Sequence, residues 1–599
     1  MRSLFLALLL AAPNSAQVVS LSRPTPAGPR VPLGGLGFSY TPERLAAMAG
    51  ETRASLTTAL DAIARTPVPQ RSFEHSGLGL GDEERARLAA ADRRLAELAQ
   101  AFSKNLNDAD LSLPAAEARL AGLPRAAIEG FELLPDGRRK VRLDAPTYGL
   151  IMERAEDRKL RRAAYYKRIN AAALENMPIL NEALKLRHES ANRLGYRNYA
   201  TMALKSRMAG APGKVWSFLL KLRRSLRPGR DAERAELKAY VKANGGPERL
   251  RPWDAAWWEA KLKRERFAYD PEEAREYFPM DKVVAETFSM YEHLLGVRFT
   301  EGPGEPWHPD VKLVSVHDAA TGARLGRFYM DMFPREGKYG HMAAFTIVKG
   351  RRLPDGSYRE PVSALVGNFT RPSGGRPSVL KPGEVKTLFH ELGHIMHQLL
   401  TTAPNWSQSG SATARDFVEA PSQMMENFVW RPETLVRLSG HWSDPSRKLP
   451  RETAERIIAS EAFGPASSAL GQAAMAAFDM AVHSTGQADA KAIYARIMKA
   501  FTGKPPAPGT NFPARFGHIM GGYAAGYYGY LWSRVFAQDV FSVFEAAGGL
   551  SAEVGRRWRE AVLERGSSRG EDESLRDFLG REPSEEAFLR WLSGSRSAS

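Results

Sequence analysis

The chain has 599 residues, 43% of them hydrophobic, so it can bury a large core, and its length permits several domains. It contains no cysteine, which excludes disulfides, cysteine nucleophiles and cysteine metal ligands and leaves histidines and carboxylates for any metal chemistry. The net charge of +16 allows nucleic-acid binding, but basic segments such as 221–227 alternate with apolar residues as on a solvated helix face. No nucleic-acid motif accompanies them, so we expect no nucleic-acid partner.

The first residues have the order of a secretory signal. Arg2 precedes an apolar run over 4–12, and Pro13 and small residues ending at Ala16 follow it. This order predicts a signal peptide over 1–16 and an exported protein, periplasmic or extracellular. The alternative is an ordinary buried N-terminal helix. The run is too short to span a bilayer and no later run reaches about 18 apolar residues, so we expect no membrane partner.

Proline and glycine over 17–38 predict an extended lead-in, with order beginning near Thr41. From there to about Thr300, apolar residues recur at three- and four-residue spacing, which predicts an almost entirely helical half. We assign 39–150 to a helical N-terminal domain and 151–599 to a second domain.

A different pattern follows in the second domain, where β-branched and aromatic residues alternate between glycines and prolines. It predicts a small sheet of about four strands over 310–369. The strand within 361–369 offers an unpaired edge to a peptide in this interpretation. Helical periodicity then resumes and predicts helices over 383–400 and 415–430. The predicted fold class is mostly α, with one small sheet directly before the first of these two helices.

That helix contains the sequence His-Glu-Leu-Gly-His over 390–394. Residues four apart share a helix face, so the imidazoles of His390 and His394 can reach one zinc ion. Glu391 would then lie beside the metal without binding it, where it can take a proton from a water that the metal has made acidic. The alternative is a chance match, because the pattern has only three fixed letters, but a helix that follows strands is the expected context.

A catalytic zinc ion takes three protein ligands, so a third should lie downstream. In the helix over 415–430, Asp416 is a plausible N-cap, and Glu419 and Glu426 lie seven residues apart on one face among apolar neighbours. We assign Glu419 as the third ligand. Glu426 either orients a histidine or faces solvent.

A further segment, 516–541, interleaves His518, Tyr523, Tyr527 and Tyr530 with five glycines. The tyrosine spacing would place the rings on one helix face, but the glycines weaken such a helix. One interpretation is a flexible strip whose phenols close on a substrate. The other is an aromatic stripe in the core.

With these segments in view, the sequence resembles the thimet oligopeptidase and peptidyl-dipeptidase family of zinc peptidases, family M3. The resemblance spans about residue 150 to the end and rests on four blocks in order: 328–345, 387–400, 415–430 and 516–541. It implies a zincin-type catalytic domain with a deep substrate channel. It also implies one zinc ion, with Tyr530 as the oxyanion donor and His518 beside it in the catalytic group. Tyr523 and Tyr527 would bind substrate.

Two other histidines are expected to lie outside the ligand set: His397 is either structural or orients a group next to the ligands, and His341 is structural. His397 lies one turn past His394 but on the wrong side for the same metal, and His341 lies in the segment before the predicted zinc helix.

The predicted function is zinc-dependent hydrolysis of peptide bonds in short peptides by a monomer. The alternatives are removal of C-terminal dipeptides, a different zinc-dependent hydrolase such as an aminopeptidase, and peptide binding without catalysis. Two imidazoles and a carboxylate also accept cobalt or manganese.

Overall fold

A computed structural model describes residues 30–31, 77–335, 337–486 and 489–592. The signal peptide predicted over 1–16 and the start of order predicted near Thr41 lie outside these residues. Within the lead-in predicted over 17–38, only β1 (Arg30–Val31) is described, and it pairs in parallel with β10 (Tyr358–Arg359). The exported location and the division into domains at residue 150 therefore stay predictions.

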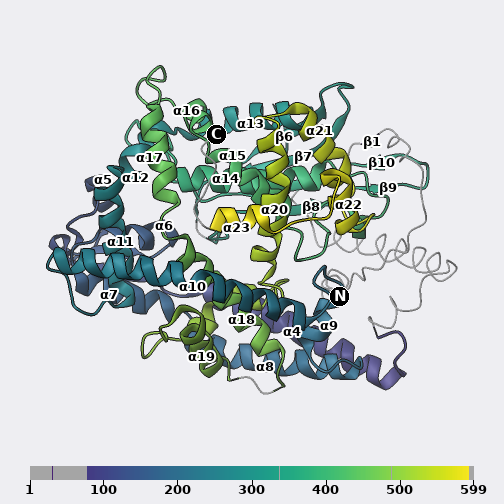
Figure 1. Ribbon diagram of the computed structural model, residues 1–599, viewed down its shortest axis with the longest axis horizontal. Coiled ribbons are helices and arrows are strands. Elements are labelled where there is room, and N and C mark those ends of the chain that lie inside the picture. The colour runs from purple at the N-terminus through teal and green to yellow at the C-terminus, as the bar shows by residue number, and fades with distance from the viewer. Residues whose placement is uncertain (1–29, 32–76, 336, 487–488, 593–599) are drawn as a thin grey trace.

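The described part of the chain is mainly helical, as predicted (Figure 1). The helices that precede the main sheet are α4 (Asp82–Asp108), α5 (Arg125–Glu129), α6 (Ala145–Arg154), α7 (Arg158–Ile169), α8 (Ala173–Arg193), α9 (Tyr199–Leu204), α10 (Pro212–Ala243), α11 (Pro252–Phe267), α12 (Pro271–Ala274) and α13 (Met280–Leu295). Those that follow it are α14 (Pro382–Leu399), α15 (Ala420–Val429), α16 (Pro432–Leu438), α17 (Arg451–Glu461), α18 (Pro465–His483), α19 (Ala490–Thr502), α20 (Gly529–Ala546), α21 (Ala552–Trp558), α22 (Glu571–Leu579) and α23 (Glu586–Leu592). Among the helices of the described ranges, none has both the length and the apolar run needed to cross a membrane.

The main sheet has five strands in the order β5-β6-β7-β11-β8; four of them lie in the predicted range 310–369 and the fifth, β5, precedes it. Its strands are β5 (Val297–Gly302), β6 (Lys312–Asp318), β7 (Arg324–Asp331), β8 (Ala343–Val348) and β11 (Val362–Val366). The prediction that residues 361–369 offer an open edge is wrong, because β11 pairs in parallel with β7 and antiparallel with β8. All five residues of β11 are buried, and the edge strand next to it is β8, with Phe345 and Ile347 exposed; β5 forms the opposite edge.

The half of the chain before residue 300 is less uniformly helical than predicted. A three-stranded sheet forms from β2 (Ser112–Ala115), β4 (Arg139–Arg142) and β3 (Glu132–Leu133), where β3 and β4 form a hairpin across Pro135, Asp136 and Gly137. Gly137 has a φ of 80°, which glycine adopts without steric cost, so Asp-Gly after a short apolar run was the signal for this turn.

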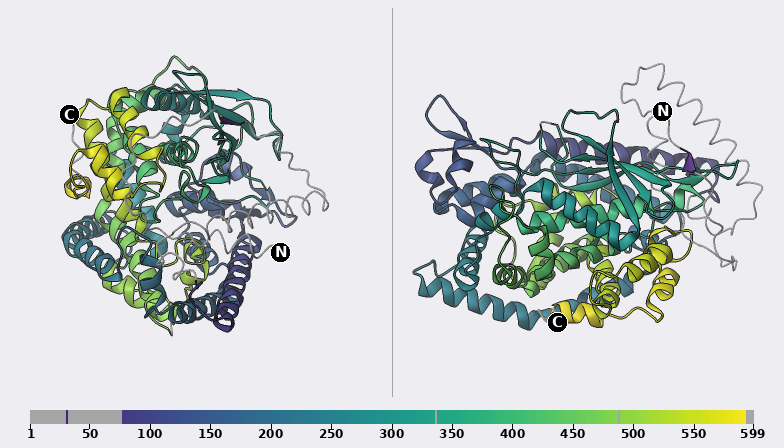
Figure 2. Two further views of the ribbon diagram at one scale, coloured as in Figure 1. Left: turned by 90° about the vertical axis from the view of Figure 1, so that its right-hand side faces the viewer. Right: turned by 90° about the horizontal axis from the view of Figure 1, so that it is seen from above.

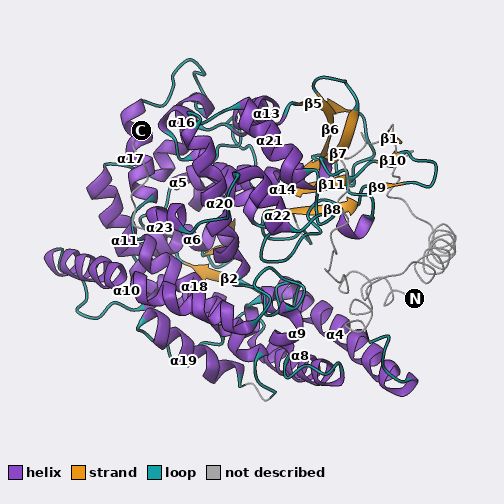
Figure 3. Ribbon diagram, turned by 45° about the vertical axis from the view of Figure 1, so that its right-hand side comes forward, coloured by secondary structure: helices purple, strands orange, loops and turns teal. Residues whose placement is uncertain are grey.

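Two large apolar clusters organise the rest. One joins α13, the main sheet, α14, α15 and most of α20, and the other joins α8, α10, α18 and the segment before α20. The start of α20 belongs to the second cluster through Leu531 and its later turns to the first through Val540 and Phe541. Figure 2 shows the helices and strands from two further sides, and Figure 3 shows the main strands gathered at one side of the helices. The segment before α20 therefore lies where the two groups of helices meet.

Candidate metal centre

The helix that carries the predicted metal ligands is α14, confirmed over Pro382–Leu399. It begins with proline in its first turn, and the backbone N–H of Lys381 donates to the Glu384 carboxylate at 2.7 Å. Both features stabilise a helix start. Its apolar face is buried in the first cluster, while His390 and His394 lie on a half-buried face.

The second helix, α15, begins at Ala420 rather than near residue 415. Glu419 is its N-cap residue, and Pro421 occupies its first turn. The two helices approach closely at Gly393, where an added Cβ would lie only 2.8 Å from the Cα of Ser422. Any larger residue would therefore separate the elements that carry the candidate ligands.

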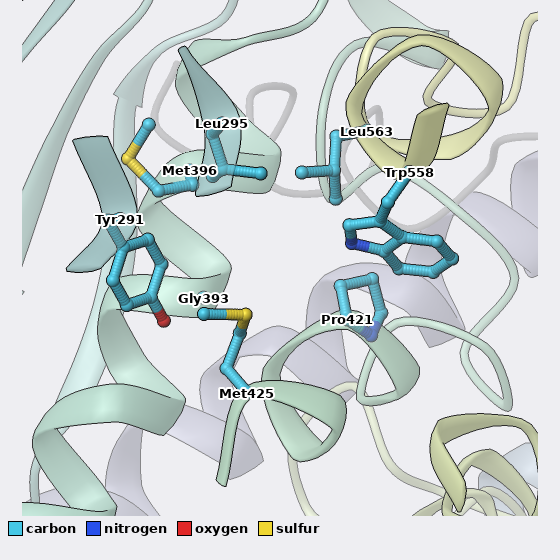
Figure 4. Close-up of a pocket in the computed structure, with 8 residues that line it drawn as sticks. All are labelled: Tyr291, Leu295, Gly393, Met396, Pro421, Met425, Trp558 and Leu563. Carbon is cyan, nitrogen blue, oxygen red and sulfur yellow. The ribbon is translucent and has the colours of Figure 1, made fainter. Parts of the chain in front are cut away.

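Little space remains between these helices. A cavity of about 10 Å³ is lined by apolar groups of Gly393, Met396, Pro421 and Met425, closed by Tyr291, Leu295, Trp558 and Leu563 (Figure 4). It offers the room of one water at most, and its lining is too apolar to hold one well. Tyr291 closes one side and donates its hydroxyl hydrogen to the carbonyl of Phe389 at 2.6 Å. The packing thus fixes α14 against its neighbours directly behind the candidate ligands.

The structure brings His390, His394 and Glu419 together, with one ligand atom of each within 4.8 Å of the others. Nε2 of His390 lies 3.2 Å and Nε2 of His394 3.1 Å from Oε2 of Glu419. Two imidazole nitrogens and one carboxylate oxygen form the His₂Glu donor set found in catalytic zinc sites. The three side chains therefore fit a single divalent cation.

The electrostatics of the cluster also favour a cation. Burial lowers the pKa of His390, but hydrogen bonds to Glu419 and Glu426 outweigh it and raise the pKa to about 10. Burial acts to raise the pKa of Glu419, yet the two imidazoles hold it well below its ordinary value. The carboxylates of Glu419 and Glu426 therefore stabilise a positive charge at this point. A divalent ion supplies that charge when the imidazoles are neutral.

Glu426 is buried, so the interpretation as a solvent-facing acid is wrong. Its Oε1 lies 2.7 Å from Nδ1 of His390, and its Oε2 accepts a hydrogen bond from Nη2 of Arg534 at 2.9 Å. A carboxylate on the far nitrogen of a metal-binding imidazole fixes the tautomer and the ring orientation. Arg534, on α20, was not singled out from the sequence because its partner is 108 residues away.

Glu391 is 7% exposed and projects from the same helix between the two histidines. Burial raises the pKa of Tyr339, and the charge of the Glu391 carboxylate adds to this shift. Tyr339 is 48% exposed, on the loop between β7 and β8. Glu391 therefore follows a candidate ligand directly in α14, and its buried carboxylate is within electrostatic reach of an exposed tyrosine.

The glycine-rich segment reaches the cluster through Tyr523, whose hydroxyl donates to Oε1 of Glu419. Tyr523 stacks on Tyr530 with ring centroids 5.0 Å apart, and His518 lies 5.7 Å from Tyr523 and 5.9 Å from Tyr530. The ring of Tyr527 lies 5.2 Å from that of His518. These side chains form one group facing the candidate ligands.

The aromatic group does not share one helix face. His518 lies in a short 3₁₀ turn (Gly517–Ile519), Tyr523 and Tyr527 lie in turns, and only Tyr530 lies in α20, in its first turn. His518 is exposed while the three tyrosines are partly buried, which excludes a core stripe. Burial raises the pKa of Tyr527 to about 12 and that of Tyr530 well above its ordinary value, with Glu419 adding to the second shift. Both phenols therefore stay protonated donors at neutral pH.

Two buried aspartates hold this segment in place. Asp479 accepts the backbone N–H groups of Ala525 at 2.9 Å and Tyr527 at 3.0 Å. Asp416 accepts the Tyr528 hydroxyl at 2.7 Å and the backbone N–H of Ala209 at 2.9 Å. The predicted role of Asp416 as a helix N-cap is wrong, because its oxygens serve groups far away in the sequence.

The remaining histidines lie apart from the ligands. His397 is fully buried on α14, and neither of its ring nitrogens has a hydrogen-bond partner among the described residues. Burial, then the charge of His394, lowers its pKa to about 3, so it is neutral. His341 is exposed next to Tyr339, with ring centroids 5.7 Å apart. Neither belongs to the His-His-Glu cluster.

A His-Glu-x-x-His helix and a glutamate from the next helix, placed beside a small mixed sheet, define a zincin-type metallopeptidase. The profile of Peptidase family M3 matches residues 151–593. The chain belongs to this family.

Known proteins support the same conclusion. The chain is 36% identical to thimet-like oligopeptidase of Dictyostelium discoideum, over 87% of this chain and 80% of that protein. It is also 36% identical to oligopeptidase A of Escherichia coli (strain K12), over 87% and 79% of the two chains. The solved structure of PZ peptidase A with an inhibitor has the same fold, with a TM-score of 0.55, 15% identity, and 89% of this chain and 82% of that chain covered. The protein is a metallo-oligopeptidase that hydrolyses peptide bonds in oligopeptides.

Proposed function

We propose that the protein is a zinc peptidase in which His390, His394 and Glu419 hold one zinc ion. The observation that carries the proposal is the convergence of two imidazole nitrogens and one carboxylate oxygen within 4.8 Å. A bound zinc ion would polarise the scissile carbonyl and make water acidic enough to be deprotonated near neutral pH.

In this proposal Glu391 is the general base. Its carboxylate takes a proton from the attacking water and returns it to the leaving amine, so that the peptide bond breaks with no net change in protonation. Its place directly after His390 in α14, outside the cluster of candidate ligands, supports this role.

Tyr530 would stabilise the oxyanion of the tetrahedral intermediate by donating its phenolic hydrogen. The raised pKa of Tyr530 supports this role, because the proton stays on the phenol throughout the reaction. The substrate would contact the rest of the aromatic group, which consists of His518, Tyr523 and Tyr527. Tyr523 would also orient Glu419 through its hydrogen bond.

The edge strand β8 would bind the peptide backbone. Strand addition uses the unpaired N–H and C=O groups of an edge and is largely independent of side chains. Phe345 and Ile347 on β8 are exposed, which leaves an apolar surface for alternate substrate side chains. Because β8 packs against α14, a peptide paired with it would pass beside Glu391.

The experiment is hydrolysis of a short internally quenched peptide by the purified full chain, with and without a chelator, and with zinc, cobalt or manganese restored after chelation. We expect cleavage to stop with the chelator and to return with zinc. Mass spectrometry of the products then separates internal cleavage from release of C-terminal dipeptides. Undiminished cleavage after complete metal removal would contradict the proposal.

A further inference from the structure

The backbone of the aromatic segment makes a tight turn after Tyr523, whose carbonyl accepts the N–H of Gly526 at 2.8 Å. Inside this turn Ala525 has a φ of 50°, in the left-handed region, which a residue with a Cβ keeps only where its surroundings enforce it. Its N–H and that of Tyr527 donate to Oδ1 and Oδ2 of Asp479 at 2.9 Å and 3.0 Å. One carboxylate on α18 therefore holds the turn that separates the two tyrosines.

Asp479 is itself held by two further buried side chains. Nδ1 of His483, one turn later on α18, lies 2.9 Å from Oδ1 of Asp479, and its Nε2 lies 3.0 Å from Nη1 of Arg187 on α8. A guanidinium can only donate, so Nε2 accepts and the ring proton stays on Nδ1, facing the carboxylate. Burial lowers the pKa of His483, which keeps the ring neutral. The three side chains, each at most 6% exposed, form one buried network.

This buried network contacts the aromatic segment a second time. Nη1 of Arg187 also donates to the carbonyl of Ile519 at 2.7 Å, so the network reaches the start of the segment as well as the turn. Tyr523 lies between these two contacts, donates to Glu419 and stacks on the ring of Tyr530. A shift of the backbone in this stretch would therefore move the aromatic group relative to the candidate ligands.

We propose that the three residues of the buried network are positioning residues for the reaction, because they set the place of the Tyr530 phenol relative to the metal. They belong to α8 and α18 in the second apolar cluster, whereas the candidate ligands belong to α14 and the start of α15, which pack in the first. A displaced oxyanion donor lowers the rate of the chemical step without weakening substrate binding. This inference rests on the proposed function, since it takes Tyr530 as that donor.

The test is a double-mutant cycle between the network and Tyr530, measured by steady-state cleavage of a quenched peptide. His483→Phe keeps a ring of similar size and removes both polar contacts. It should lower kcat by about tenfold to a hundredfold, with less than about a threefold change in KM. In the Tyr530→Phe background the same change should cost less than about threefold, because the donor that it displaces is already gone. His483→Gln, which offers both a donor and an acceptor, should recover part of the loss.

A second measurement does not need turnover. Hydrogen exchange followed by mass spectrometry should show the amides over 519–528 exchanging about tenfold faster in His483→Phe, with the zinc content unchanged. His293→Phe is the matched control, because its imidazole is exposed on α13, and it should leave kcat, exchange and zinc content unchanged. If His483→Phe does not fold, Arg187→Lys, whose ammonium retains the charge but not the fork, decides by the same cycle.

An unchanged kcat in His483→Phe, or equal losses with and without the Tyr530 hydroxyl, would overturn the inference while metal-dependent cleavage by the unmodified chain left the proposed function standing. No metal-dependent cleavage by the unmodified chain would instead refute the proposed function and, with it, the kinetic role of the network. Faster exchange over 519–528 would in that case still show that the network holds the aromatic segment.

Discussion

Nδ1 of His390 lies 2.7 Å from the carboxylate of Glu426, and the same carboxylate accepts a hydrogen bond from Arg534. The imidazole is therefore held from behind while its Nε2 faces Glu419. Arg534 also lies with its guanidinium carbon 5.4 Å from the ring centroid of Trp591, which connects α23 to the back of the candidate metal centre. The support for one candidate ligand thus extends to the C-terminal helix.

Glu426→Gln should weaken metal binding by about tenfold to a hundredfold, because the amide cannot replace the charged acceptor that orients His390. Competition with a chelator measures the affinity, and circular dichroism checks the fold. Glu452→Gln, an exposed position on α17, is the control and should bind metal like the unmodified chain. Unchanged affinity in Glu426→Gln would show that this carboxylate does not support the ligand.

Gly393→Ala should destabilise the protein by about 1–3 kcal/mol, because the added methyl group lies 2.8 Å from the backbone of Ser422. Gly383→Ala in the same helix has nothing within 4 Å of the added Cβ and should be neutral or slightly stabilising. Urea unfolding of both variants measures the difference. Equal stability of the two would mean that α14 and α15 can separate freely at this point.

Tyr530→Phe should lower kcat by about a hundredfold with little change in KM, because the phenol would act on the oxyanion and not on the ground state. Tyr165→Phe on α7 removes the same hydroxyl away from the candidate site and should leave both constants unchanged. Steady-state kinetics on a quenched peptide measures this. A rise in KM alone would reassign Tyr530 to substrate binding.

Asp331 should make stability depend on pH. Burial acts to raise its pKa, but Arg335, Lys338 and Trp307 outweigh it and lower the pKa from 3.8 to about 2. A lowered folded-state pKa stabilises above the unfolded value and is lost as pH falls, so about 2 kcal/mol should disappear between pH 4 and pH 2. Lys338 donates a hydrogen bond to the same Asp331 carboxylate, and this contact anchors the loop that contains Tyr339.

Urea unfolding at several pH values tests this against Asp331→Asn. The difference in unfolding free energy between the unmodified chain and this variant should shrink across that range. Asp108→Asn, at a 57% exposed side chain, is the control. A constant difference for Asp331→Asn would place the acid sensitivity elsewhere.

The local parts of the site were predictable from sequence. The spacing of His390 and His394 within an apolar periodicity sufficed for α14, and a carboxylate among apolar neighbours just downstream pointed to Glu419, the N-cap residue of α15. The roles of Asp416 and Asp479 were not predictable. Their partners lie up to 208 residues away, and no local pattern reports such a pairing.

Strand order was the other failure. The pattern over 361–369 indicates a buried strand, but it does not say which strands pair with it. In the structure β11 lies between β7 and β8, which are at different distances from it in the sequence. Strand order depends on how distant segments of the chain pack together, which a local pattern does not report. For this reason the sequence analysis predicted an open edge at β11, whereas an open edge lies at β8.

The central claim is that Glu391 performs proton transfer while three other side chains hold the metal, and the most direct test compares Glu391→Gln with His390→Ala. Metal content by mass spectrometry and cleavage of a quenched peptide are measured on the same samples. The account predicts that Glu391→Gln keeps one zinc ion per chain and loses turnover, whereas His390→Ala loses both. Turnover retained in Glu391→Gln, or zinc lost from it, would contradict the account.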